Sequence, residues 1–198
     1  LTTYLNYNKY IDACKSSIDA TVGYDYQHWK STSPQYSELN ILAEPQSTTA
    51  ATDQRHVLLS YYARLNYTFD SRYMLTATMR RDGTSRFNSD NRWGTFPSVA
   101  LAWRVSEEAF LKDNPVLSNL KLRASYGVTG QQDGIGNYNY LPVYTASQTG
   151  AEALFGNQYT TTYRPEAYVS GLKWETTTAW NVGFDFGLLK DRITGSFD

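Results

Sequence analysis

Apolar and polar residues alternate along most of this chain, in stretches longer than the strands of ordinary proteins. Between residues 55 and 69 every odd position from 57 onward is apolar, and most positions between them are polar. Successive side chains of a β-strand point to opposite faces, so such a segment has one apolar and one polar face. Because ordinary strands average about 5–6 residues and a tilted strand needs about 9–11 to cross a bilayer core, the pattern predicts membrane-crossing strands.

Eight segments share this pattern, and helical periodicity is nearly absent. Among the connections between them, two are tight turns, one is of moderate length, and three are long and polar. Short turns at one end of the strands and long loops at the other are typical of an outer-membrane β-barrel. The predicted strands cover residues 1–11, 15–29, 55–69, 72–82, 93–105, 119–129, 172–188 and 191–198; the tight turns lie at 70–71 and 189–191, the moderate connection at 106–118, and the long loops at 30–54, 83–92 and 130–171.

We therefore predict an all-β fold, an antiparallel transmembrane β-barrel. A soluble β-sandwich also has alternating strands and is the alternative. The two differ at the odd positions 57–69, which would face lipid in a barrel and a second sheet in a sandwich. Aromatic residues are expected to form a girdle at each membrane surface. These are Tyr67, Phe69, Tyr73, Phe184 and Phe186 near the short turns, and Tyr24, Tyr26, Trp29, Trp93 and Trp174 near the long loops.

The composition excludes several classes of protein. A formal net charge of −1 gives no support to a nucleic-acid binder, which usually carries a basic excess. The single cysteine, Cys14, cannot form an internal disulfide, and no Cys/His cluster suits a zinc ion. No run of about 18 apolar residues is present, which argues against a transmembrane helix. The sequence begins without Met and both ends fall inside strand patterns, so we expect a piece of a longer protein.

No catalytic motif is visible, so we expect neither an enzyme nor a cofactor or metal site. The two histidines, His28 and His56, lack the context of a metalloprotease or nucleophile motif, and His56 is interpreted as an ordinary interface residue. The Glu107–Glu108 pair is expected to cap a short helix that begins at Ser106. The glycine-rich stretch 130–137 lacks the Lys-Ser/Thr ending of a phosphate loop and is interpreted as the flexible entry to a surface loop.

Three stretches resemble the SusC/RagA family of TonB-linked outer-membrane transporters of Bacteroidetes. Their order and spacing match the family from Tyr61 to Asp198, whereas residues 1–55 resemble it only in texture. The stretches are YARLNY at 62–67 with YMLTATMRRDGTSRF at 73–87; FPSVALAWRVSEE at 96–108 with LKLRASYGVTG at 120–130; and LKWETTT at 172–178 with NVGFDFG at 181–187 and RITGS at 192–196.

The resemblance implies a large plugged barrel of about 22 strands. Residues 1–198 would then be part of one barrel domain, about eight wall strands with long extracellular loops, while the plug and the C-terminal strands are absent. Alone, such a piece would leave strand edges unpaired. In this interpretation Trp174, Trp180, Val182, Phe184 and Phe186 face lipid, Glu175, Asn181 and Asp185 face the lumen, Gly183 and Gly187 admit neighbouring side chains on the lumen face, and Asp82–Gly83 forms a turn.

The function that the resemblance implies is nutrient import across the outer membrane. Family members take up oligosaccharides beneath a SusD-like surface lipoprotein that acts as a lid, and energy reaches them through TonB by way of the plug. A peptide importer of the same family is not separated from this by the sequence. Outside the family, the sequence also leaves open an independent small outer-membrane barrel with a structural or adhesive role, and a soluble carbohydrate-binding sandwich.

The binding candidates lie in and near the long loops. The loop 130–171 combines tyrosines with amides, a mixture that suits sugars or peptides, although the same tyrosines could pack on the loop itself or on a partner lipoprotein. Three arginines near the long loops, Arg80, Arg81 and Arg86, could line the barrel mouth, bind anionic outer-leaflet lipid, or pair with Asp82 and Asp90. The candidates are Arg80, Arg81, Arg86, Gln131, Gln132, Tyr138, Tyr140 and Tyr144.

Overall fold

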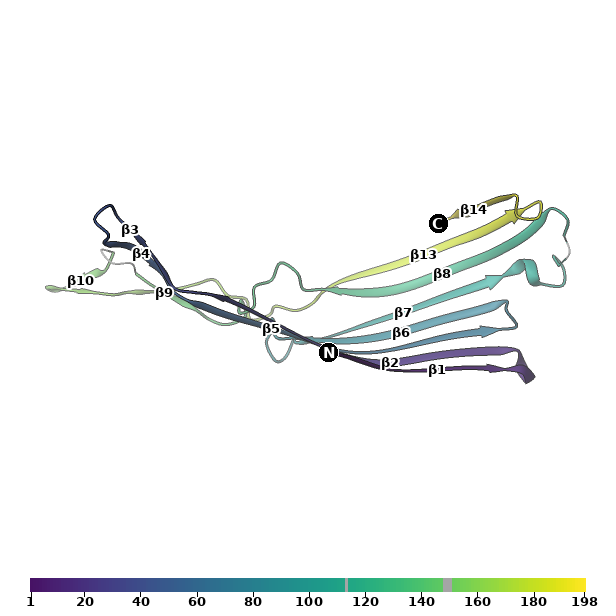
Figure 1. The fold of residues 1–198 in the computed structure, drawn as a ribbon, viewed down its shortest axis with the longest axis horizontal. Coiled ribbons are helices and arrows are strands. Elements are labelled where there is room, and N and C mark those ends of the chain that lie inside the picture. Colours follow the sequence, from purple (N-terminus) through teal and green to yellow (C-terminus); the bar gives the residue numbers. More distant parts are fainter. Residues whose placement is uncertain (113, 148–150) are drawn as a thin grey trace.

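The chain forms one eight-stranded antiparallel sheet, seen in a computed structural model that describes residues 1–112, 114–147 and 151–198 (Figure 1). Asp113 and residues 148–150, which belong to two of the predicted connections, lie outside the described residues. The strand order is β1-β2-β5-β6-β7-β8-β13-β14. The strands are β1 (Thr2–Ile11), β2 (Ser16–Ser33), β5 (Thr52–Phe69), β6 (Tyr73–Thr84), β7 (Trp93–Arg104), β8 (Leu117–Gln131), β13 (Glu175–Leu188) and β14 (Ile193–Phe197).

The eight predicted strands are therefore confirmed, and each pairs with its neighbour in the sheet. The longest ladder joins β2 to β5 without interruption, from Ser16↔Phe69 to Ser33↔Thr52. Its length exceeds that of the predicted segments because both strands continue past the sheet at the end where the long loops lie (Figure 1). We call this the long-loop end of the sheet, and the opposite end the short-turn end.

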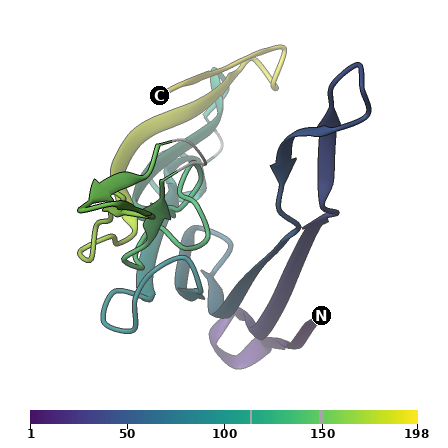
Figure 2. The ribbon, with the colours of Figure 1, turned by 90° about the vertical axis from the view of Figure 1, so that its left-hand side faces the viewer.

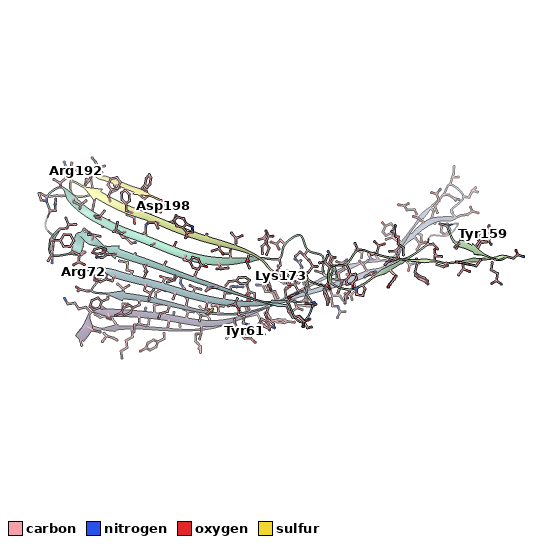
Figure 3. The ribbon with its side chains drawn as sticks, turned by 180° about the vertical axis from the view of Figure 1, so that it is seen from behind. Tyr61, Arg72, Tyr159, Lys173, Arg192 and Asp198 are labelled. Carbon is pink, nitrogen blue, oxygen red and sulfur yellow. The ribbon has the colours of Figure 1, made fainter. Side chains whose placement is uncertain are left out.

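The tight turns are confirmed at the short-turn end. Asp70 and Ser71 both have positive φ angles, 46° and 55°, as a two-residue type I′ hairpin turn requires. The three residues 189–191 also have positive φ angles. Figure 3 shows Arg72 and Arg192, which follow these two turns, at the same end of the sheet. The single-turn 3-10 helix η1 (Asp12–Cys14) joins β1 to β2 at this end.

The strand register separates an apolar face from a polar face. At the short-turn end, the pairing Phe69↔Tyr73↔Trp103↔Leu122↔Phe184↔Phe197 aligns an apolar row across six strands. At the long-loop end of the same face, the Tyr61 ring lies 5.5 Å from the Tyr24 ring and 6.1 Å from the Trp93 ring. The odd positions 57–69 belong to this apolar face, and among the described residues no second sheet covers it; Tyr61 is 49% exposed and Leu65 38%. The sandwich alternative is therefore wrong.

The long loops carry short hairpins that the sequence did not predict. Between β2 and β5, the strands β3 (Tyr36–Leu39) and β4 (Pro45–Thr49) form one hairpin. Between β8 and β13, β9 (Tyr144–Ala146) pairs with β12 (Tyr163–Pro165), and β10 (Ala153–Phe155) pairs with β11 (Gln158–Thr160). Figure 2 shows the β3–β4 hairpin and the hairpins of the second loop as two separate arms. In Figure 3 Tyr159 lies at the far tip of the second arm.

Trp174 does not face outward as predicted. It lies just before β13 and is 9% exposed, in a small core with Phe87 and Phe96, whose rings meet its indole edge-on at 5.7 and 5.3 Å. Its Nε1 donates a hydrogen bond to the carbonyl oxygen of Arg92 at 3.0 Å. The period-two rule fails here because residue 174 precedes the first paired residue of the strand, Glu175.

Two further local predictions are wrong. Asp82 and Gly83 form no turn, because they continue β6 and pair with Gly94 and Trp93; a Cβ on Gly83 would lie 2.9 Å from the Trp93 ring. Near Ser106 there is a 3-10 helix, η2 (Val105–Glu107), without a side-chain cap. The prediction for Gly183 and Gly187 is confirmed in so far as the carboxylates of Asp198 and Asp191 occupy the space beside them.

Glu108 does not cap a helix; its side chain connects the end of η2 to β6 and β7 at the short-turn end. Its carboxylate accepts hydrogen bonds from Tyr73 Oη, from Trp103 Nε1 at 3.0 Å and from Arg72 at 3.2 Å. The Tyr73 and Trp103 donors, with the Arg72 charge, lower the pKa of Glu108, because they stabilise its ionised form.

In the described part of the chain, no helix has the length and apolar character needed to cross a membrane.

Candidate ligand-binding groove at the long-loop end

A polar groove opens on the polar face at the long-loop end, with a volume of about 480 Å³. Strands β2 and β5 form its floor, since both extend past the rest of the sheet. The loop that follows β6 and the first residues after β8 form its walls. Its lining residues are Gln27, Trp29, Ser31, Gln54, His56, Leu58, Arg86, Gln132, Asp133 and Asn137.

Two stacked rings dominate the floor of this groove. The register pairs Trp29 of β2 with His56 of β5, and their rings stack 4.6 Å apart with only 12° between the planes. His56 is buried and its Nε2 lies 3.3 Å from the hydroxyl of buried Thr84. Trp29 is 45% exposed, so the indole face away from His56 is open to the groove. The imidazole thus holds a partly exposed aromatic ring in a fixed orientation.

Arg86 connects the two walls of the groove by hydrogen bonds. Its guanidinium donates to the carbonyl oxygen of Gln132 at 3.1 Å and to Asn137 Oδ1 at 3.3 Å, and it lies 4.0 Å from the Asp133 carboxylate. These contacts connect the loop after β6 with the loop after β8, two segments about 50 residues apart. Because both Nε and Nη1 donate to acceptors on the loop after β8, Arg86 fixes the shape of the groove.

Gln132 brings a buried polar side-chain atom to the groove. Its Oε1 is buried and has no partner with full hydrogen-bond geometry within the described residues, although the Gln132 side chain also interacts with the neighbouring His56 imidazole. Buried acceptors in folded proteins almost always have a partner, so this atom is suited to accept a hydrogen bond from water or a ligand. The neighbouring amides of Gln27, Gln54 and Asn137 give the groove both donors and acceptors without a fixed charge.

The two adjacent arginines Arg80 and Arg81 lie on opposite faces of the sheet. Arg80 is on the polar face, where its Nε contacts both oxygens of Asp82 at 2.8 and 2.9 Å and its second nitrogen donates to Ser60 Oγ at 2.9 Å. Arg81 is on the apolar face, 5.2 Å above the ring of Trp93. The alternative that pairs an arginine with Asp82 thus holds for Arg80, and the two side chains cannot act on one ligand.

The remaining candidates lie outside the groove. Gln131 ends β8 and is exposed opposite Glu175. The Tyr138 hydroxyl accepts a hydrogen bond from the Arg55 backbone at 3.1 Å and so anchors the loop beside the groove. Tyr140 is half-buried in the same loop, and Tyr144 is exposed in β9.

Of the predicted site residues, the structure therefore brings only Arg86 and Gln132 together. The residues missed at this site are Trp29, assigned to the girdle, and His56, interpreted as an ordinary interface residue. The alternation along β2 could have identified Trp29. Odd positions of β2, including 29, lie on the polar face, whereas even positions, including Tyr24 and Tyr26, lie on the apolar face. No cluster of three potential metal-ligating side chains occurs in the stretches that the structure describes.

The fold defined by these strands is that of an antiparallel β-barrel wall, and comparison with known proteins identifies its family. The family model described as "TonB dependent receptor-like, beta-barrel" matches residues 2–198. The chain belongs to this family, and the resemblance inferred from sequence motifs is confirmed. The match also includes residues 2–55, which the motifs alone had related to the family only loosely.

Among curated proteins, the chain is 46% identical over 209 residues to TonB-dependent receptor SusC of Bacteroides thetaiotaomicron, covering 98% of this chain and 20% of SusC. It is 34% identical to TonB-dependent receptor P39 of Formosa agariphila, covering 98% of this chain and 19% of P39. A solved structure of the RagAB peptide importer in its open-open state aligns with a TM-score of 0.79 and 25% identity, over 98% of this chain and 22% of that chain. The chain thus spans about a fifth of the length of these relatives.

Proposed function

We propose that this chain forms part of the barrel wall and the outer mouth of a TonB-dependent importer in the Gram-negative outer membrane. The apolar face contacts lipid, the polar face lines the lumen, and the long-loop end lies outside the cell. This orientation follows the pattern of outer-membrane barrels, which have short turns on the periplasmic side and long loops outside. The protein moves its ligand without chemical change, and neither a metal nor a cofactor takes part.

The proposed substrate is an oligosaccharide. The observation that carries this proposal is the groove on the polar face at the mouth, which combines an exposed indole face with amides and with the opposite charges of Arg86 and Asp133. Arrangements of this kind suit neutral polyhydroxylated ligands, because the amides can both donate to and accept from hydroxyl groups. A SusD-like surface lipoprotein would cover the mouth as a lid, and TonB would act through a plug region outside residues 1–198, which are part of a single barrel domain.

A peptide substrate is the second candidate, favoured by the similarity to the RagAB peptide importer. The groove itself gives it less support. Extended peptides commonly bind by adding a strand to a free sheet edge, whereas β2 and β5 are paired to each other along the whole floor. The Nε and Nη1 groups of Arg86, which could otherwise hold a peptide carboxylate, already donate to Asn137 and to the carbonyl oxygen of Gln132.

The test is uptake by cells that carry or lack the full-length gene. Cells are supplied in parallel with fluorescently labelled neutral oligosaccharides and with labelled peptides of similar mass, and periplasmic fluorescence is measured. We expect gene-dependent and TonB-dependent uptake of at least one oligosaccharide. Gene-dependent uptake of peptides alone would assign the second function instead.

A further inference from the structure

We propose that Trp29, held against His56, is a stacking platform for one sugar ring, with Gln132 Oε1 as an acceptor for a hydroxyl group of the same sugar. The inference rests on the proposed function and makes it specific, since it names the residues that would contact the oligosaccharide. It concerns only the groove on the polar face at the long-loop end, and not the exposed tyrosines of the two arms.

The first support is the fixed orientation of the Trp29 ring. A side chain on an exposed strand normally loses rotamer entropy when a ligand immobilises it, which weakens binding. Here the stack on buried His56, 4.6 Å away at 12°, already restrains the indole before any ligand arrives. His56 is restrained in turn by its contact with Thr84, which is fully buried. The platform is thus preorganised by the β2–β5 register.

The second support is a buried acceptor, Gln132 Oε1, which lacks a well-formed hydrogen bond and adjoins the same His56 imidazole on which Trp29 stacks. A buried acceptor without a well-formed hydrogen bond is unfavourable in a folded protein, so Gln132 Oε1 gains from a donor supplied by a ligand. A sugar hydroxyl is a donor of the right kind, because it carries no charge that the groove would need to neutralise. Arg86 keeps Gln132 in place through the backbone carbonyl of that residue.

The third support is the absence of net charge in the groove together with its volume. Arg86 and Asp133 are of opposite sign and lie 4.0 Å apart, so the groove offers no net charge to an ionic ligand. Its volume of about 480 Å³ falls within the range of about 300–1,000 Å³ typical of small-molecule sites. The ligand class that fits an aromatic face, neutral amides and this volume is a short stretch of a neutral oligosaccharide.

The experiment uses the full-length receptor, purified in detergent together with its lipoprotein partner, and isothermal titration calorimetry. The probes are maltohexaose, xylohexaose, mannohexaose and fructohexaose, with hexaalanine as the peptide probe. Trp29→Leu removes the flat ring but keeps an apolar side chain on His56, and Trp29→Phe restores an aromatic face. Trp180→Leu is the matched control, because Trp180 is 78% exposed on the apolar face of β13.

We expect at least one hexaose to bind the wild type, about ten-fold more weakly to Trp29→Leu, and within about three-fold of wild type to Trp29→Phe and Trp180→Leu, since a specific aromatic contact contributes about 0.5–1.5 kcal/mol and 1.4 kcal/mol is ten-fold. A ligand-induced change in tryptophan fluorescence should also disappear in Trp29→Phe. This second measurement carries the test if Trp29→Leu fails to fold.

The outcomes separate this inference from the proposed function. If a hexaose binds the wild type and the Trp29 variants retain both its affinity and the fluorescence change, the platform is refuted while the oligosaccharide importer stands. If no hexaose binds, or if only hexaalanine binds, the oligosaccharide substrate is refuted and the platform falls with it.

Discussion

An arginine placed in the middle of the apolar face provides a quantitative test of how the sheet meets the membrane. Leu65 lies halfway along β5 between two rows of aromatic residues. Phe69, four residues away, belongs to the row at the short-turn end, and Tyr61, four residues away in the other direction, belongs to the aromatic cluster at the long-loop end. At about 3.4 Å per residue the two rows are ~27 Å apart along the strand, or ~20 Å along the membrane normal for a tilt of about 40°. This span agrees with an apolar band of about 25 Å and places Leu65 near the bilayer midplane.

Leu65→Arg should therefore lower the free energy of unfolding by about 2–4 kcal/mol. The control is Ser125→Arg, at nearly the same depth on the polar face, because Ser125 adjoins Tyr126 in the row of Leu65. Both variants of the full-length receptor are unfolded with guanidinium in phospholipid vesicles, and the free energies are compared with wild type. Equal destabilisation by the two arginines, or a larger effect of Ser125→Arg, would refute the assignment of the faces.

Three further predictions concern packing and pH. Trp174→Ala should destabilise the receptor by about 3–5 kcal/mol in denaturant unfolding, because it empties the small core and removes the hydrogen bond that Trp174 Nε1 donates to the Arg92 carbonyl. Gly23→Val should destabilise it by about 1–3 kcal/mol, since the Tyr62 ring lies where the Cβ would be, and adding Tyr62→Ala should recover part of this loss. The contribution of Glu108 to the free energy of unfolding should be present at neutral pH and be lost as the pH falls through its lowered folded-state pKa. Glu108→Gln should therefore reduce the loss of stability on the acid side of a plot of unfolding free energy against pH, the acid limb.

Each of these predictions has a result that contradicts it. Wild-type stability of Trp174→Ala would show that the core with Phe87 and Phe96 is not formed in the whole receptor. Strictly additive effects of Gly23→Val and Tyr62→Ala would mean that the two residues do not touch. An acid limb that is the same in wild type and Glu108→Gln would exclude the hydrogen bonds from Tyr73 and Trp103 as the cause of the lowered pKa.

The alternating pattern was sufficient to predict the sheet, because strand geometry leaves little freedom once the register is fixed. All eight strands and the turns at 70–71 and 189–191 agree with the sequence prediction, and the odd positions of β5 lie on one face as expected. The failures occur where strand geometry ends. Trp174 lies one residue before β13, and the loop hairpins β3–β4, β9–β12 and β10–β11 depend on local turns with weak periodicity.

The groove was only partly predictable for a different reason. Arg86 and Gln132 were chosen as polar residues in loops, and the structure brings them together through a contact between segments far apart in sequence. Trp29 and His56 were missed because neither is distinctive alone. Their significance appears only when the β2–β5 register places them opposite each other on the polar face.

The central claim, that this sheet is a barrel wall with lipid on one face, is tested most directly by a spin-label scan of β13. The exposed Cys14 is replaced by serine, and single cysteines are introduced at positions 178–185 of the full-length receptor in membranes. Accessibility to oxygen and to a water-soluble nickel chelate is measured at each position. The account predicts a period of two, with positions 180, 182 and 184 in the lipid phase and 181, 183 and 185 shielded from it. A scan without alternation, or with the opposite phase, would contradict it.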